Sequence, residues 1–250
     1  MLSMADPSWR PLLQRGLEAV AAADPAYLPE LERDQYLPTE GRLFAAFAQP
    51  FDAVRYVLVG EGPYPRADSA TGVCFMDGAV QGLWSPEGLS KQVNRATSLR
   101  NFIKMLLVAD GLLAADHTSG TALAPVSVKA RAIGSPFIQN LDAMQANLHR
   151  HGFLLLNAAL VFRPHVAPVK DARAWQPFID VVLTALSLAA VPPVLVLWGK
   201  IATQLQALPA VALLPQLCAE HPYNLSFIQS AIMRDLFRPM RLLLRQTNGQ

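Results

Sequence analysis

Four short apolar runs constrain the fold of this chain more than any other feature of its sequence. They cover residues 56–60 (YVLVG), 153–157 (FLLLN), 194–199 (VLVLWG) and, more weakly, 211–218. Such runs are too short for helices and too uniformly apolar for strands that have one face in water. They are therefore typical of buried parallel strands.

Segments with helical spacing lie between these runs. They are residues 98–107, which begin with Ser98 as a predicted N-cap, residues 140–151 and residues 175–188. An alternation of strand and helix predicts an α/β fold with three layers, in which helices flank a central, mostly parallel four-stranded sheet. Residues 63–86 and 110–135 are rich in glycine and small polar residues, which indicates loops.

Composition limits the class of protein. With 250 residues and a net charge of +2, the chain is expected to form a single domain over residues 1–250, and a monomer. Its two cysteines, Cys74 and Cys218, are too few for a disulfide framework and lack the spacing of a zinc site, so no metal is expected. The longest apolar run, 185–198, is interrupted by Ser187 and two prolines and falls short of the roughly 20 residues of a membrane helix. These features indicate a cytoplasmic protein with no membrane partner.

Polar residues follow each predicted strand. In an open α/β sheet, ligands bind beyond the carboxyl ends of the strands. The positions there are 60–65 (GEGPYP), Asn157, 199–200 (GK) and the loop that starts at His221. Taken singly, each is more often structural, because Gly-x-Gly-Pro forms tight turns, asparagine ends strands, and a lone histidine is commonly a satisfied structural side chain.

Taken together and in order, these motifs resemble the uracil-DNA glycosylase family. The family motifs read GQDPYH, a phenylalanine in the same loop, LLLN, LLWG and HPSPLS, and this chain has GEGPYP, CFM, LLLN, VLWG and HPYNLS. The resemblance extends to Trp9, to residues 36–60 and to the helix start at Ser98, with an insertion near 108–135. It implies a DNA repair enzyme that flips uracil out of single- or double-stranded DNA and hydrolyses its N-glycosidic bond, leaving an abasic site, without a cofactor.

The same resemblance assigns roles in the base pocket. Phe75 would stack on the uracil ring. The amide of Asn157 would match the N3–H and O4 edge of uracil and mismatch cytosine. Tyr64 would exclude the methyl group of thymine, and His221 would donate a hydrogen bond to uracil O2 as charge builds on the leaving base.

Three further residues are predicted to contact DNA. Leu225 takes the position of the side chain that enters the base stack in place of the flipped nucleotide, although ordinary packing within the loop is the alternative. Ser98 and Ser226 match family serines that contact phosphate groups. Hydroxyl contacts of this kind fit a chain of weak net charge, so the dependence of DNA binding on salt is expected to be modest.

The first motif departs from the family. The water-activating aspartate falls at Gly62, and loss of a general base costs about 10²- to 10⁴-fold in rate. Glu61 is a candidate replacement, although adjacent residues of an extended segment point in opposite directions. Asp68 and Asp77 in the following loop are rival carboxylates. The motif's final histidine is Pro65 here.

Three functional alternatives remain open. His221 together with substrate distortion could support a slower reaction without any carboxylate. The protein could instead recognise a DNA lesion without cutting it. A nucleotide hydrolase is a weaker alternative, because the chain lacks the phosphate-binding GxxxxGK motif.

Overall fold

The computed structural model describes residues 2–206 and 208–246 of the chain. The chain divides into two compact units, one built from residues up to 78 with 152–217, and the other from 79–151 with residues from 218 onward. The first is called the sheet unit below and the second the helical unit. The single domain over residues 1–250 stays a prediction.

The sheet unit is organised around four strands in the order β4-β1-β5-β6. Their bounds are Tyr56–Gly60 for β1, Phe153–Asn157 for β4, Val194–Trp198 for β5 and Gln216–Ala219 for β6, whose last residues pass into the other unit. β1 pairs in parallel with both β4 and β5. The predicted α/β class with a central parallel four-stranded sheet flanked by helices is confirmed.

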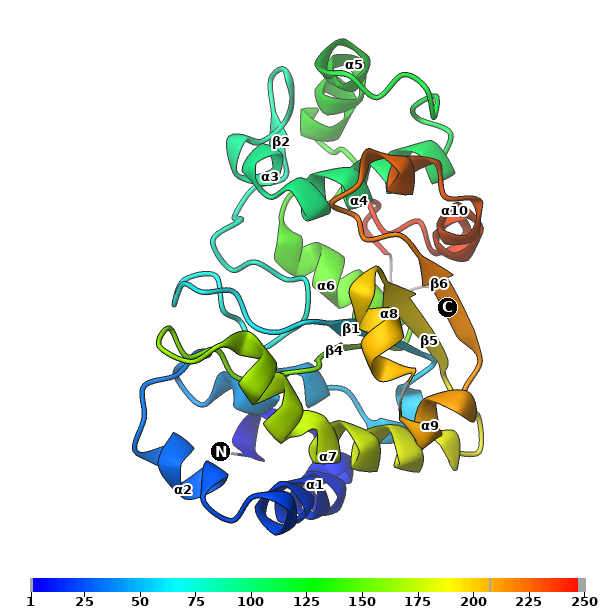
Figure 1. The fold of residues 1–250 in the computed structure, drawn as a ribbon. Helices are drawn as coiled ribbons and strands as arrows, with labels where there is room; N and C mark the ends of the chain where they lie inside the picture. The colour runs from blue at the N-terminus through cyan, green and yellow to red at the C-terminus, as the bar shows by residue number, and fades with distance from the viewer. Residues whose placement is uncertain (1, 207, 247–250) are drawn as a thin grey trace. The chain divides into compact units, whose positions relative to one another are not determined.

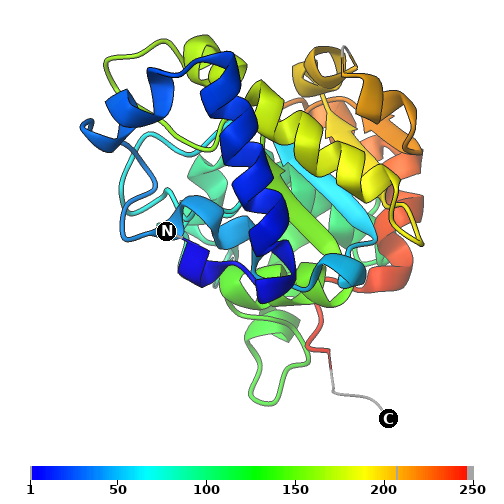
Figure 2. The same ribbon diagram turned by 90° about the horizontal axis from the view of Figure 1, so that it is seen from below.

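Two long helices cover one face of this sheet. α1 (Arg10–Ala23) and α7 (Pro168–Ser187) lie side by side across the strands (Figures 1 and 2). They approach closely at Gly16, where a Cβ atom would lie 2.5 Å from a ring carbon of Phe178. Val59 of β1 and Leu156 of β4 belong to the core that the strands and helices share. The shorter helices of the unit are α2 (Tyr27–Glu32), α8 (Lys200–Leu205), α9 (Pro209–Ala212), η1 (Leu2–Met4), η2 (Pro7–Trp9), η3 (Arg42–Phe47) and η4 (Phe51–Ala53).

A buried ion cluster fixes the segment that follows β4. The Arg163 guanidinium lies 2.7 Å from Asp171 Oδ1 and 3.1 Å from Asp34 Oδ2. The Tyr27 hydroxyl also donates to Asp171 Oδ1, at 2.7 Å. Burial, followed by the hydrogen bond to Asp171, raises the pKa of Tyr27. The cluster thus ties the chain after β4 to α2 and α7.

The charge of Asp171 is expected to contribute to stability. Its side chain is only 2% exposed, so Asp171→Asn keeps the shape of the group but weakens three charge-assisted hydrogen bonds, two from Arg163 and one from Tyr27. We expect the free energy of unfolding to fall by about 2 kcal/mol. Thermal unfolding measures this loss, with Asp180→Asn on the same helix as the control. An unchanged melting temperature in Asp171→Asn would contradict the assignment.

The helical unit packs around α4 (Thr97–Ala109). α10 (Ala231–Phe237) and η5 (Leu225–Gln229) pack against α4, and the rings of Phe102 and Phe237 meet edge to face at 5.2 Å. The remaining elements are β2 (Trp84–Ser85), β3 (Gly88–Leu89), α3 (Lys91–Arg95), α5 (Gly120–Arg131), α6 (Leu141–Arg150) and η6 (Arg238–Met240).

Three local expectations were wrong. Residues 110–135 are not a loop throughout, because α5 forms there and packs on the β2–β3 hairpin, where Ser127 donates a hydrogen bond to the Ser85 carbonyl. The fourth strand begins at Gln216 rather than 211, because α9 occupies part of the predicted range. Ser98 is not an N-cap, since α4 begins one residue earlier.

Within the described residues, no helix has the length and apolar character that spanning a membrane requires. The same residues contain no group of three or more His, Cys, Asp or Glu side chains placed to hold a metal ion.

Candidate active site

The carboxyl ends of β1 and β4 meet at the candidate site in the sheet unit. Gly60 and Asn157 are register partners at the ends of these strands. Pairing continues beyond them, because Ala158 N–H donates to the Gly60 carbonyl at 2.8 Å and Ala159 N–H to the Glu61 carbonyl at 3.0 Å. The start of the first motif is therefore held beside the residues that follow Asn157.

The Asn157 amide projects from the face of the sheet opposite α1 and α7. A Cβ atom at Gly60 would lie 3.0 Å from Asn157 Oδ1 and 2.5 Å from Cys74 Sγ. Only glycine fits at that position. Asn157 is 4% exposed, and burial raises the pKa of the neighbouring Cys74 thiol to about 12. A neutral, well-packed surface thus surrounds the amide.

An unusual backbone conformation orients the Phe75 side chain. Its φ of 67° lies in the left-handed region, which only a few per cent of non-glycine residues occupy. Cys74 N–H fastens the segment to the Leu155 carbonyl of β4 at 3.0 Å, and the Thr71 hydroxyl donates to the Met76 carbonyl at 2.9 Å. The half-buried Phe75 ring meets Trp198, at the end of β5, edge to face at 5.4 Å.

Tyr64 is neutral and half-buried. Burial raises the pKa of its hydroxyl, and the nearby Asp77 and Cys74 raise it further. The two rival carboxylates of this loop both lie near Arg66, Asp77 at 3.8 Å and Asp68 at 4.0 Å. Their negative charge is therefore already partly balanced within the loop.

Glu61 and Gly62 follow β1 and have different surroundings. Glu61 lines a cavity of about 450 Å³ with Arg173 of α7 and Lys200 of α8, on the α7 side of the sheet. The structure thus does not bring its carboxylate together with Asn157. At Gly62, a Cβ atom would meet only Ala159 atoms, at 3.6 Å, so there is ordinary space for a side chain.

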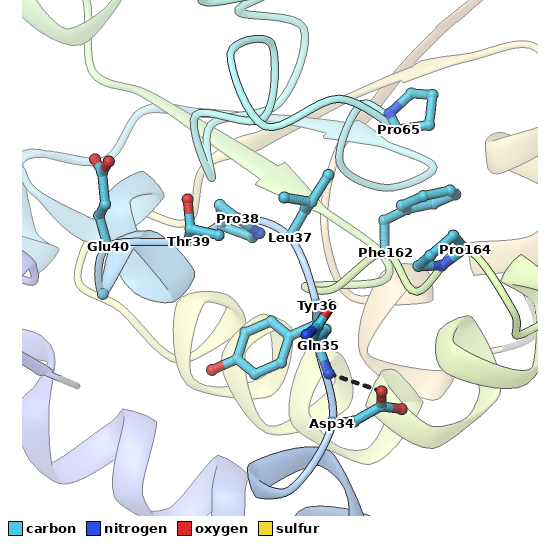
Figure 3. A pocket seen from close by; sticks show the side chains of 11 residues that line it. Asp34, Gln35, Tyr36, Leu37, Pro38, Thr39, Glu40, Pro65, Phe162 and Pro164 are labelled. Atoms are coloured by element: carbon cyan, nitrogen blue, oxygen red, sulfur yellow. Dashed lines mark hydrogen bonds between the residues drawn. The ribbon is translucent and has the colours of Figure 1, made fainter.

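A second cavity, of about 510 Å³, lies beside Pro65. Figure 3 shows the rings of Pro65, Phe162 and Pro164 on one side of it and Leu37 and Pro38 on the other. Pro65 therefore supplies an apolar wall where the family motif has a histidine.

In the helical unit, the local hydrogen bonding of the His221 loop sets the tautomer of the imidazole. Tyr223 N–H donates to His221 Nδ1 at 3.1 Å, so Nδ1 is an acceptor and the neutral ring carries its proton on Nε2. The buried Asn101 of α4 donates to the carbonyls of Pro222, at 2.8 Å, and Tyr223, at 3.3 Å. The ring thus presents a hydrogen-bond donor from a loop that is fastened to a helix.

The predicted DNA-contacting residues also belong to the helical unit. Leu225 is 67% exposed at the start of η5, as an apolar side chain that enters a base stack would be. Ser98 is half-buried in the first turn of α4. Ser226 is exposed, and its hydroxyl donates to Glu220. Within the described part of this loop, Leu225 and Tyr223 are the exposed large apolar residues.

Sequence reasoning missed Asn101 and Glu220. Asn101 stands in the SLRN stretch, on a helix whose other buried positions are apolar, and this contrast could have singled it out. No comparable signal marks Glu220, whose role depends on how the loop folds back on itself.

The buried Asn157 amide and the Phe75 ring, at the carboxyl ends of a parallel sheet, place the candidate site where α/β proteins bind their ligands. No family model matches the chain. It is 31% identical to uracil-DNA glycosylase 1 of Streptomyces avermitilis, over 84% of this chain and 77% of the relative, and 29% identical to the uracil-DNA glycosylase of Corynebacterium glutamicum, over 88% and 80%. The crystal structure of wild-type UNG from Nitratifractor salsuginis superposes with a TM-score of 0.88 at 40% identity, covering 98% of this chain and 96% of that one. The chain belongs to the uracil-DNA glycosylase family, so the family that the sequence predicted is confirmed.

Proposed function

We propose that this protein excises uracil from single- or double-stranded DNA by hydrolysing the N-glycosidic bond, leaving an abasic site. The observation that carries the proposal is the buried Asn157 amide at the strand ends, beside the strained Phe75. The relatives named uracil-DNA glycosylase support it. We further propose that the protein acts as a cytoplasmic monomer and needs no cofactor.

The base pocket is proposed to recognise uracil by its edge and its face. A stacked base cannot be reached, so the nucleotide must first leave the duplex. The Phe75 ring would then stack on uracil, Asn157 would pair with N3–H and O4, and Tyr64 would close the space beside C5. A neutral Tyr64 hydroxyl suits contact with an apolar ring edge.

His221 is proposed to stabilise the leaving base. As the bond between N1 and C1′ breaks, its electron pair moves onto uracil, and water adds to C1′ with loss of a proton. Because Nδ1 accepts from Tyr223 N–H, the neutral ring carries its proton on Nε2, from which it would donate to uracil O2 as the negative charge grows. Leu225 would fill the vacated stack, and Ser98 and Ser226 would contact phosphate groups.

Gly62 favours a second candidate function, the recognition of uracil or another DNA lesion without cleavage. A glycine cannot orient water or face a cationic sugar, and Glu61 lies on the α7 side of the sheet. A protein that keeps the base pocket but lacks this carboxylate would still bind the base without cleaving its bond.

Cleavage of oligonucleotides that contain one uracil, single- and double-stranded, separates the two candidates. Strand scission after alkaline treatment reports the abasic site, and fluorescence anisotropy reports binding. The proposal expects cleavage by the wild type. Tight binding to uracil-containing DNA with no cleavage would favour the lesion-binding alternative instead.

Asn157→Asp is expected to shift base preference away from uracil. An ionised carboxylate accepts hydrogen bonds but donates none, so it loses the match to uracil O4 and leaves that atom unpaired. We expect uracil excision to fall by about 10²-fold, from the cost of an unpaired group in a site built for hydrogen bonding. Competition between uracil- and cytosine-containing oligonucleotides measures the shift. Asn94→Asp, on the exposed surface of α3, is the control, and an unchanged preference in Asn157→Asp would show that the pocket is assigned wrongly.

A further inference from the structure

Two side chains of the His221 loop converge on one carboxylate oxygen. The Asn224 amide donates to Glu220 Oε2 at 3.3 Å, and the Ser226 hydroxyl donates to the same oxygen. Glu220, Asn224 and Ser226 are all exposed. The chain therefore binds an anionic oxygen of its own at the tip of this loop.

This contact is not what fixes the loop. Buried Asn101 holds the backbone at Pro222 and Tyr223, and Asn224 N–H donates to the His221 carbonyl at 2.9 Å. The surface contact through Glu220 adds little to such an anchor, because exposed polar pairs contribute weakly to stability. The two groups that donate to the Glu220 carboxylate, the Asn224 amide and the Ser226 hydroxyl, indicate a different role for it.

An amide and a hydroxyl that converge on one charged oxygen are the groups that proteins use to bind phosphate oxygens. They flank Leu225, the residue proposed to enter the base stack, and a phosphate lies next to every base step. At the position of Asn224 the family motif HPSPLS has a proline, which has no side-chain donor. Asn224 therefore adds a donor that the family motif lacks.

We propose that Asn224 adds a second donor to the phosphate contact already assigned to Ser226, and that Glu220 occupies this site in the free protein until a DNA phosphodiester displaces it. The inference rests on the proposed function, because it requires this loop to meet DNA. Displacement leaves the Glu220 carboxylate near a phosphate of the same charge. Glu220 therefore weakens DNA binding and speeds release, while it keeps both donors in position between encounters.

Binding of a fluorescein-labelled duplex without uracil tests this role, by anisotropy at about 50 mM and about 200 mM salt. Removing the internal anion in Glu220→Ala should tighten binding by about fivefold at the lower salt, the effect of one like-charge contact in water. The gain should shrink at the higher salt, where the repulsion is screened. It should also disappear in the Asn224→Ala/Ser226→Ala background, because no donors remain for the phosphate.

Asp116→Ala is the matched control, since it removes an exposed carboxylate from another loop of the same unit. An equal gain in Asp116→Ala would overturn the inference, because net charge alone would then explain it. Weaker or unchanged DNA binding by Glu220→Ala would also overturn the inference. Glu220 would then only stabilise the conformation of the loop. If the wild type cleaves uracil-containing DNA in either case, only this inference fails; if it neither binds nor cleaves DNA, the proposed function fails as well.

Discussion

Cleavage of uracil-containing DNA should become about 10²- to 10⁴-fold faster when Gly62 is replaced by aspartate, the contribution of a general base. The variant is expected to fold normally, because the nearest atoms to a new Cβ belong to Ala159 at 3.6 Å. The new side chain would lie beside Ala159, two residues beyond Asn157, near where a flipped nucleotide is proposed to bind. Single-turnover kinetics with excess enzyme measure the chemical step apart from product release.

Two variants control for other causes of a faster reaction. Gly62→Asn adds a side chain of the same shape without a carboxylate, so it should give no comparable gain. Glu61→Gln should leave cleavage within about twofold, because the Glu61 side chain lines the cavity beside α7 and α8. A large loss in Glu61→Gln would instead show that Glu61 turns toward the sugar in the complex with DNA.

No gain in Gly62→Asp would carry a different meaning. It would show that another group already activates water, or that the reaction proceeds by departure of the base before water attacks. Asp77 is the first carboxylate to test in that case, because it is buried and close enough to raise the pKa of Tyr64.

The strands could be predicted from the sequence because their burial is nearly complete. β1 and β4 agree with the predicted ranges to the residue, since the positions that the structure buries in these two runs are apolar apart from the terminal Asn157. β6 was placed too early because the segment before it is equally apolar. Pro209 starts a short helix there, at the first-turn position that proline favours.

α5 could not be predicted because its stability depends on tertiary contacts. Its sequence, GTALAPVSVKAR, has a weak apolar stripe and an internal proline, Pro125. The helix forms where Leu123 packs over Gly88 of the hairpin and Ser127 bonds to the Ser85 carbonyl. Neither contact leaves a local sequence signal.

The site divides in the same way. The residues proposed to contact a base or phosphate come from the resemblance, which fixes their order along the chain, and their contacts stay predictions. Groups that orient them could not be predicted, since Asn101 and Glu220 act through contacts with backbone carbonyls and loop side chains. Glu61 lies between these cases, because alternation along an extended segment predicts that it points away from Gly62, whereas the cavity that it lines depends on the fold.

His221→Leu should slow uracil excision by about 10²- to 10³-fold, the cost of removing one donor to a developing oxyanion. The substitution leaves the Asn101 hydrogen bonds to the Pro222 and Tyr223 carbonyls available, so the loop should keep its shape. His117→Leu, at an exposed position of the same unit, should have no effect on the rate. Single-turnover cleavage measures both variants.

A change of leaving group separates a role in chemistry from a role in folding. 5-Fluorouracil carries negative charge more easily than uracil, so it needs less help from a hydrogen bond to O2. If His221 stabilises the leaving base, the loss caused by His221→Leu should be smaller for 5-fluorouracil than for uracil. An equal loss with both bases would mean that the substitution disturbs the loop or the binding of DNA, because a structural defect does not depend on the acidity of the base that leaves.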